Sequence, residues 1–108
     1  MPSKRWRATM EDFTLWLALM GFEPEVRFGG VSGRRRWRFD YAIPARKIAV
    51  EYHGQGAGHF GLKGAWRDQA KASEATVCGW RLITCNAGSV ADGRCQAWID
   101  HVLAETEQ

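Results

Sequence analysis

The chain has 108 residues, of which 45% are hydrophobic and 25% are charged, and its formal net charge is +3. This length provides for one compact domain over residues 1–108 and excludes two domains of ordinary size. No apolar run approaches the roughly 18 residues of a membrane-spanning helix, and no apolar segment follows the basic N-terminus, so we expect neither a membrane span nor a signal peptide.

Basic residues are concentrated in the first part of the chain. Residues 1–47 contain ten of the fifteen Lys and Arg residues but five of the twelve acids. The clusters lie at residues 4–7, 34–38 and 46–47. A one-sided basic surface suits a polyanion, whereas the alternative is a solvated face that keeps the domain soluble. We expect a nucleic acid as the partner.

A helix is predicted near the N-terminus. Thr9 followed by Asp12 has the character of a capping box, and the apolar residues at positions 13, 16, 17 and 20 follow the spacing of an amphipathic helix. Gly21 is well placed to end it. A short strand over residues 25–28 and a glycine-rich turn over 29–33 come next.

Two strands joined by a tight turn at residues 44–46 are predicted next. Alternation places Trp37, Phe39, Tyr41 and Ile43 on one face of the first strand and Arg36, Arg38, Asp40 and Ala42 on the other. In the second strand, one face has Ile48, Val50 and Tyr52 and the other has Ala49, Glu51 and His53. Each strand carries one acid, and an unpaired buried carboxylate is costly. Asp40 and Glu51 therefore suggest a cation between the strands.

The rest of the chain predicts one more strand between two helices. A glycine-rich stretch at residues 54–64 precedes a helix from residue 66 to about residue 78, a buried strand follows at 80–85, and a C-terminal helix begins with capping residues at 89–92. The order α-β-β-β-α-β-α predicts an α/β (α+β) domain, in which helices flank a mixed central sheet.

The cysteine pattern predicts unpaired thiols. Cys78, Cys85 and Cys95 are an odd number without a close pair. Disulfide frameworks are typical of oxidising compartments, whereas free thiols persist in a reducing cytosol. We therefore expect three free thiols and a cytoplasmic protein.

Two acids on neighbouring strands suit the hydrolysis of a phosphodiester. The reaction requires neutralised phosphate charge, an activated water and a stabilised leaving oxygen, and divalent metal ions provide all three. Magnesium prefers oxygen ligands and retains several waters. Asp40 and Glu51 converge if their strands are antiparallel, and the main-chain carbonyl of Tyr52 would add a ligand.

The ordered motifs resemble those of the PD-(D/E)XK nuclease superfamily, and of its small phage-type members in particular. The similarity covers roughly residues 25–86, with matching segments at residues 39–44, 48–54, 68–71 and 79–83 and a histidine, His59, in the glycine-rich loop. The resemblance implies a restriction-endonuclease-like αβββαβ core with an extra C-terminal helix. It also implies a metal-dependent nuclease of a bacterium or phage-infected host cell, with Asp40 and Glu51 as metal ligands.

Two positions depart from the superfamily's pattern. The usual lysine two residues after the second acid is replaced by His53, which can act as a cation or a proton shuttle. Lys71, on the following helix and one turn from Asp68, is the other source of a positive charge. For the acid that several members carry on the first helix, Glu11 is the candidate metal ligand and Glu25 its rival.

The expected activity is that of a Mg²⁺-dependent endodeoxyribonuclease, with Mn²⁺ as the alternative cofactor. We expect a structure-selective enzyme of DNA recombination or repair that cuts branched DNA such as a Holliday junction or flap, as a homodimer if it cuts two strands symmetrically. The alternatives are a mismatch- or nick-directed endonuclease, a restriction-like phage endonuclease, and a DNA-binding domain without catalysis. The expected DNA contacts are Arg34, Arg35, Arg36, Arg38, Gln55, His59 and Lys63.

Overall fold

The structure of the protein is a computed structural model, which describes residues 8–54 and 62–106. Its elements follow the predicted order, with a short 3-10 turn and one additional helix. They are α1 (Met10–Leu19), β1 (Glu23–Phe28), β2 (Trp37–Ile43), η1 (Pro44–Arg46), β3 (Ile48–Tyr52), α2 (Leu62–Val77), β4 (Arg81–Cys85), α3 (Ala87–Ala91) and α4 (Arg94–Thr106).

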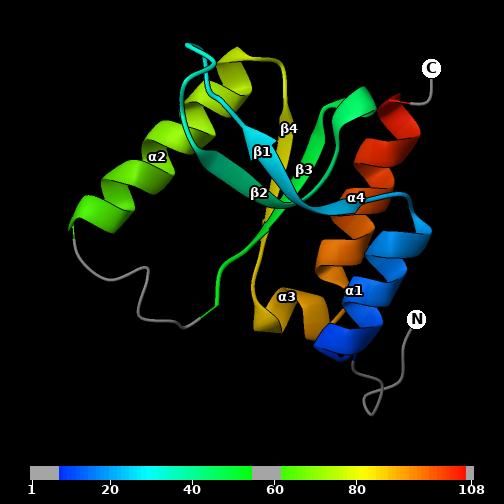
Figure 1. Ribbon diagram of the computed structural model, residues 1–108. Helices are drawn as coiled ribbons and strands as arrows, with labels where there is room; N and C mark the ends of the chain where they lie inside the picture. Colours follow the sequence, from blue (N-terminus) through cyan, green and yellow to red (C-terminus); the bar gives the residue numbers. More distant parts are fainter. Residues whose placement is uncertain (1–7, 55–61, 107–108) are drawn as a thin grey trace.

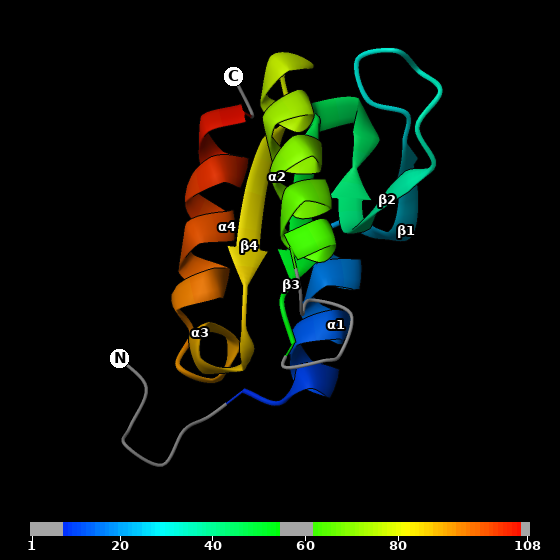
Figure 2. The same ribbon diagram turned by 90° about the vertical axis from the view of Figure 1, so that its left-hand side faces the viewer.

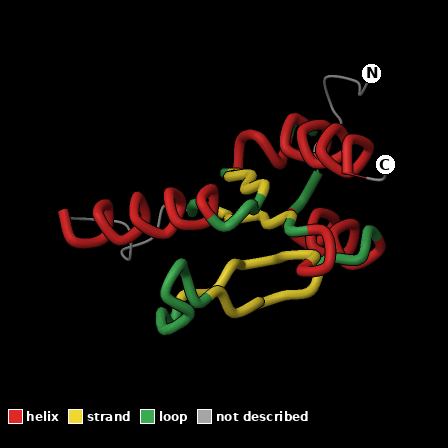
Figure 3. The backbone as a smooth tube through the Cα atoms, turned by 90° about the horizontal axis from the view of Figure 1, so that it is seen from above, coloured by secondary structure: helices red, strands yellow, loops and turns green. Residues whose placement is uncertain are grey.

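The four strands form one mixed sheet in the order β1-β2-β3-β4. The pairs β1–β2 and β2–β3 are antiparallel, and β3–β4 is parallel because α2 carries the chain back along the sheet. Helix α2 covers one face of the sheet, whereas α1 and α4 cover the other (Figures 1, 2 and 3). The predicted α/β class, with a mixed sheet flanked by helices, is confirmed.

Each face of the sheet has its own apolar core. The cluster beneath α1 and α4 includes Phe13, Leu17 and Ile99, which pack on Ile48 and Val50 of β3. The cluster beneath α2 consists of Phe28, Phe39, Ala42, Ala49 and Ala75. All of these side chains are less than one-tenth exposed, so β3 contributes to both cores.

Strand β2 changes its alternation at Asp40. Tyr41 and Ile43 pack against the core beneath α1 and α4, whereas Trp37 and Phe39 belong to the core beneath α2. The prediction that these four residues share one face is therefore wrong. β2 pairs with β3 only from Tyr41 onward, whereas its first half pairs with β1 alone, so the change of face lies where the second neighbour begins.

The start of α1 is confirmed as a capping box. The Asp12 N–H donates to Thr9 Oγ1 at 3.0 Å, and the Thr9 N–H donates to Asp12 Oδ2 at 3.1 Å. The bond from the Thr9 main chain, and then that with its side chain, hold the pKa of the Asp12 carboxyl below its ordinary value. This contribution to the helix start is present at neutral pH and is lost as pH falls through that lowered pKa.

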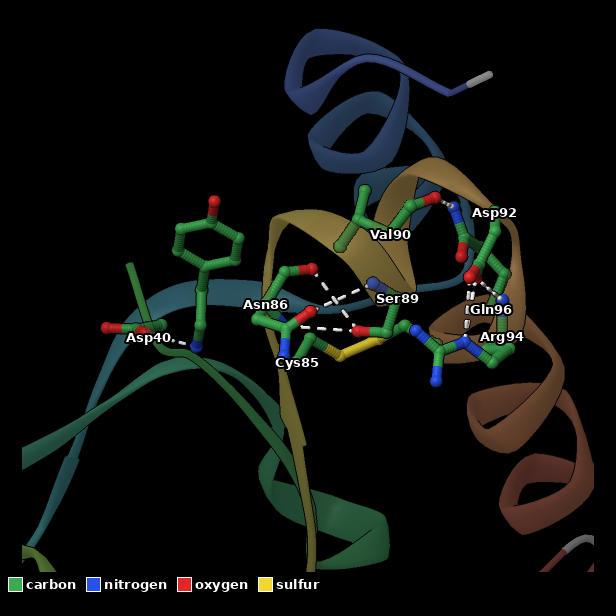
Figure 4. The surroundings of a disulfide bond; sticks show 10 residues. Asp40, Cys85, Asn86, Ser89, Val90, Asp92, Arg94 and Gln96 are labelled. Carbon is green, nitrogen blue, oxygen red and sulfur yellow. Dashed lines mark hydrogen bonds and ion pairs between the residues drawn. A yellow bond between two sulfur atoms is a disulfide. The ribbon is translucent and has the colours of Figure 1, made fainter. Parts of the chain in front are cut away.

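The C-terminal region contains two helices instead of one, and its cap differs from the prediction. Asn86 is the N-cap of α3: its Oδ1 accepts the Ser89 N–H at 2.9 Å, and Ser89 Oγ accepts the Asn86 N–H at 3.0 Å (Figure 4). Gly93, in a left-handed conformation with φ of 86°, lies between α3 and α4. Ser89 is therefore the reciprocal partner within the first turn and not the cap.

The prediction of three free thiols is wrong for two of them. Cys85, at the end of β4, forms a disulfide with Cys95 in the first turn of α4 (Figure 4). Helix α3 turns the chain back, which brings together two residues ten apart in the sequence. Cys78 retains a free, half-buried thiol. The inference of a reducing compartment thus loses its main support.

Within residues 8–54 and 62–106, none of the helices combines the length and apolar character that crossing a bilayer would require.

Reduction of the disulfide is expected to destabilise the fold. A closed loop of this length lowers the chain entropy of the unfolded state by the equivalent of about 3 kcal/mol. The Cys85→Ser/Cys95→Ser variant should lose about this much unfolding free energy in urea titrations. Alkylation of the unreduced, denatured protein should add one label, on Cys78, and three labels after reduction. Three labels before reduction would contradict the pairing.

Candidate active site

Asp40 and Glu51 meet where β2 and β3 separate. Tyr41 pairs with Val50, so continuation of the register places Asp40 opposite Glu51. The Asp40 N–H donates to Glu51 Oε2 at 2.9 Å, and the Tyr52 N–H donates to Asp40 Oδ2 at 2.7 Å. Each carboxylate thus accepts a main-chain N–H of the neighbouring strand, and these crossed bonds hold the two acids together.

Lys71 lies on α2 and reaches the same point. Its Nζ contacts Glu51 Oε1 and also donates to the main-chain oxygen of Arg38. The Lys71 and Glu51 side chains are 13% and 15% exposed, so water screens this ion pair only in part. The ammonium also lies 5.3 Å from the centre of the Phe39 ring. Of the two predicted sources of positive charge, Lys71 is the one in direct contact with an acid.

A shallow pocket of about 170 Å³ surrounds these groups. Its lining consists of Asp40, Glu51, Tyr52, His53, Asp68 and Lys71. His53 is exposed, and its main-chain N–H donates to the Cys85 carbonyl at 2.7 Å, which joins the end of β3 to β4. The structure therefore brings together both predicted metal ligands, both candidate cations and the supporting Asp68.

A second hollow adjoins the first. It has a volume of about 240 Å³, shares Glu51, His53 and Asp68 with the first pocket, and extends between α2 and β4 past Gln69 and Thr84. The sequence did not single out Thr84, because its proximity depends on the parallel register that places it beside Glu51.

Glu25 lies closer to the acid pair than its rival. Pro24 pairs with Tyr41 and Val26 with Phe39, so Glu25 occupies the position opposite Asp40. Its φ of 53° is left-handed, which is uncommon for a residue other than glycine. The three acids therefore follow one row across β1, β2 and β3.

Glu11 is placed differently. It is exposed in the first turn of α1. The hollow of about 320 Å³ between α1 and the sheet is lined by Met10, Glu25 and Asp40 among others, so Met10 is the residue that α1 contributes beside Asp40. Glu25 therefore lines this hollow with Asp40, whereas Glu11 is not among its lining residues.

The predicted DNA-contacting residues fall into distinct environments. Arg36 and Arg38 line a pocket of about 280 Å³ with Arg27, which the sequence pattern did not single out. Arg35 is paired with Glu74 at 3.9 Å. Arg34 and Lys63 are exposed, in the β1–β2 loop and the first turn of α2. Gln55, His59 and the N-terminal basic cluster lie outside the described residues.

The residues present fit a hard divalent cation in part. Across residues 8–54 and 62–106, no three His, Cys, Asp or Glu side chains are arranged together to hold a metal ion. Asp40 and Glu51 do supply two carboxylates at one point. The Tyr52 N–H faces β2, where it donates to Asp40. The N–H and C=O of a strand residue face the same neighbouring strand, so the Tyr52 carbonyl also faces β2. Magnesium completes such a set with water.

Comparisons with known proteins supply no relative for this site: neither a protein-family model, nor a curated protein, nor a solved structure matches the chain.

Removal of Lys71 is expected to destabilise the fold through Glu51. In Lys71→Met, the mostly buried carboxylate loses its cation and the Arg38 carbonyl loses a donor, so urea unfolding should show a loss of about 2 kcal/mol. Glu51→Gln in the same background should recover part of this loss, because the uncompensated charge is removed.

The control for these Lys71 and Glu51 variants is Lys63→Met, the same change at an exposed position of the same helix. It should leave the unfolding free energy within about 0.5 kcal/mol of the wild-type value. Additive effects of the Lys71 and Glu51 changes would contradict a direct interaction between them.

Proposed function

We propose that the protein is a metal-dependent endonuclease of PD-(D/E)XK type that hydrolyses phosphodiester bonds in DNA. The observation that carries this proposal is the convergence of Asp40, Glu51 and Lys71 at the point where β2 and β3 separate. Two carboxylates and an ammonium in an open, polar pocket provide the charges that phosphodiester hydrolysis requires.

In this proposal Asp40, Glu51 and the Tyr52 carbonyl hold a Mg²⁺ ion, for which Mn²⁺ can substitute. The ion, when bound, supplies an activated water and neutralises charge on the phosphate. The crossed main-chain bonds hold one oxygen of each carboxylate in place, so the acids require little reorganisation when a cation binds.

Lys71 and His53 have separate roles in this proposal. The Lys71 ammonium, held beside Glu51, stabilises the negative charge that develops on the phosphate. His53, exposed at the pocket mouth, delivers a proton to the leaving oxygen. In this proposal Glu25 of β1 is the third acid. The strand register places it opposite Asp40, on the side of β2 away from Glu51.

Branched DNA is the proposed substrate. The acids line a pocket together with the exposed His53, which gives a nucleic-acid backbone a route to them. The exposed arginines suit contacts with phosphates, which position a strand without reading its sequence, and this favours recognition of DNA shape. Symmetric cutting of two strands requires two sites and therefore a homodimer.

A DNA-binding domain without catalysis is the second candidate. It is favoured by the contact of Lys71 with Glu51, which already satisfies one oxygen of the carboxylate. A binding domain without catalysis also agrees with the absence of a third metal-ligating side chain beside Asp40 and Glu51 among the described residues.

Cleavage of labelled DNA distinguishes the two candidates. The protein is incubated with a four-way junction, a flap and a linear duplex, with Mg²⁺, Mn²⁺ or EDTA. We expect metal-dependent cutting of the branched DNAs, and a loss of at least about 100-fold in Asp40→Asn, since this change removes a charge that holds the metal. Asp100→Asn, the same change at an exposed position of α4, should retain activity. Salt-sensitive binding without cutting under any condition would support the binder.

The roles of Lys71 and His53 separate in the same assay. Lys71→Ala should lower kcat by about 100-fold or more, because the positive charge beside the reacting phosphate is lost. His53→Ala should have a smaller effect on kcat, of about tenfold. Loss of turnover in the histidine variant alone would show that Lys71 does not stabilise the reacting phosphate.

A further inference from the structure

Three arginines form a basic pocket on the β1–β2 hairpin. Arg27, Arg36 and Arg38 line a hollow of about 280 Å³ and are all exposed. The ion pairs between described residues involve other cations, so none of these three arginines is paired with an acid within residues 8–54 and 62–106. The pocket therefore concentrates positive charge.

The strand register opposes two of these charges directly. Arg27 of β1 is the cross-strand partner of Arg38 of β2, and like charges in such a position destabilise a sheet. Phe28 and Phe39, the next residue along each strand, are buried beneath α2. Strand alternation therefore directs Arg27 and Arg38 to the opposite face of the hairpin. A bound anion would remove this repulsion.

The neighbouring Arg35 differs in its surroundings. Its guanidinium lies 3.9 Å from Glu74 Oε2 and 4.7 Å from the centre of the Trp37 ring. Arg35 thus has an acid partner and an aromatic surface within the fold, whereas Arg27 and Arg38 face each other.

We infer that Arg27, Arg36 and Arg38 bind a backbone phosphate of the nucleic-acid strand that the acid pair cuts. The identity of the polyanion rests on the proposed function, whereas the anion site rests on the pocket alone. The planar donor groups of arginine match the geometry of a phosphate. Contacts of this kind position a strand without reading its sequence.

The pocket lies near the acids along the same strand. Arg38 and Asp40 are two residues apart on β2, a distance of about 6.6 Å. A strand bound at Asp40 therefore passes near the arginine pocket.

Binding measurements in a cleavage-deficient background test this inference. Fluorescence anisotropy of fluorescein-labelled single-stranded and duplex DNA is measured at several KCl concentrations with the Asp40→Asn protein. Adding Arg27→Gln should weaken binding by about five- to tenfold at low salt and lower the slope of log affinity against log salt by about 1, equally for unrelated sequences. Adding Arg94→Gln, the matched control at an exposed arginine of α4 that is paired with Asp92, should change affinity by less than about twofold.

An unchanged affinity and salt slope in Arg27→Gln, or an equal effect of Arg94→Gln, would overturn the inference. Thermal unfolding of each variant shows whether a loss of binding reflects a loss of fold. If Arg27→Gln is unfolded, Arg27→Lys replaces it, because lysine keeps the positive charge. Arg27→Lys should retain the salt slope if the inference holds and should lose it if the effect is structural.

The outcomes also distinguish this inference from the proposed function. DNA cleavage by the wild-type protein together with no effect of Arg27→Gln on binding would leave the nuclease proposal and refute the arginine site. Arg27-dependent binding without cleavage under any metal condition would support the arginine site and refute the nuclease proposal. If both hold, Arg27→Gln should raise KM for DNA and leave kcat nearly unchanged, because the pocket contacts the strand away from the reacting phosphate.

Discussion

The crossed hydrogen bonds between Asp40 and Glu51 are the interaction on which the site depends. At this point β2 stops pairing with β3, and carboxylates bind main-chain N–H groups at 2.9 Å and 2.7 Å. Buried main-chain donors require a partner, so the acids satisfy the backbone while the backbone orients the acids. A strand pair that continued its ladder would leave neither carboxylate in this position.

The crossover helix α2 adds a cation to the two acids on the strands. A parallel β3–β4 pair requires a long connection, and α2, whose Lys71 contacts Glu51, supplies it across one face of the sheet. Lys71 comes from the middle of that helix and neutralises one of the two charges. The same helix buries Ala75 against Phe39 and Ala42. The packing that stabilises the second core therefore also places the cation.

On the β1–β2 hairpin, two like charges lie opposite each other instead of forming an ion pair. Acid and base meet inside the fold at Glu51 and Lys71, whereas Arg27 and Arg38 oppose each other on its surface. The first arrangement is satisfied internally, and the second is the one at which we infer that an external anion binds. In the proposed nuclease, the same β2 strand thus presents positive charge for binding at Arg38 and negative charge for chemistry at Asp40.

The sequence by itself determined the order of the strands, the start of α1 and the presence of one acid on each of two adjacent strands, because capping patterns and apolar periodicity are local signals. It did not determine which distant residues meet. The contact of Lys71 with Glu51, the position of Glu25 beside Asp40, the pairing of Arg27 with Arg38 and the Cys85–Cys95 disulfide all depend on strand register and on how α2 and α3 return the chain. Even the faces of β2 required the tertiary structure, since β1 pairs along the strand but β3 pairs only with its second half.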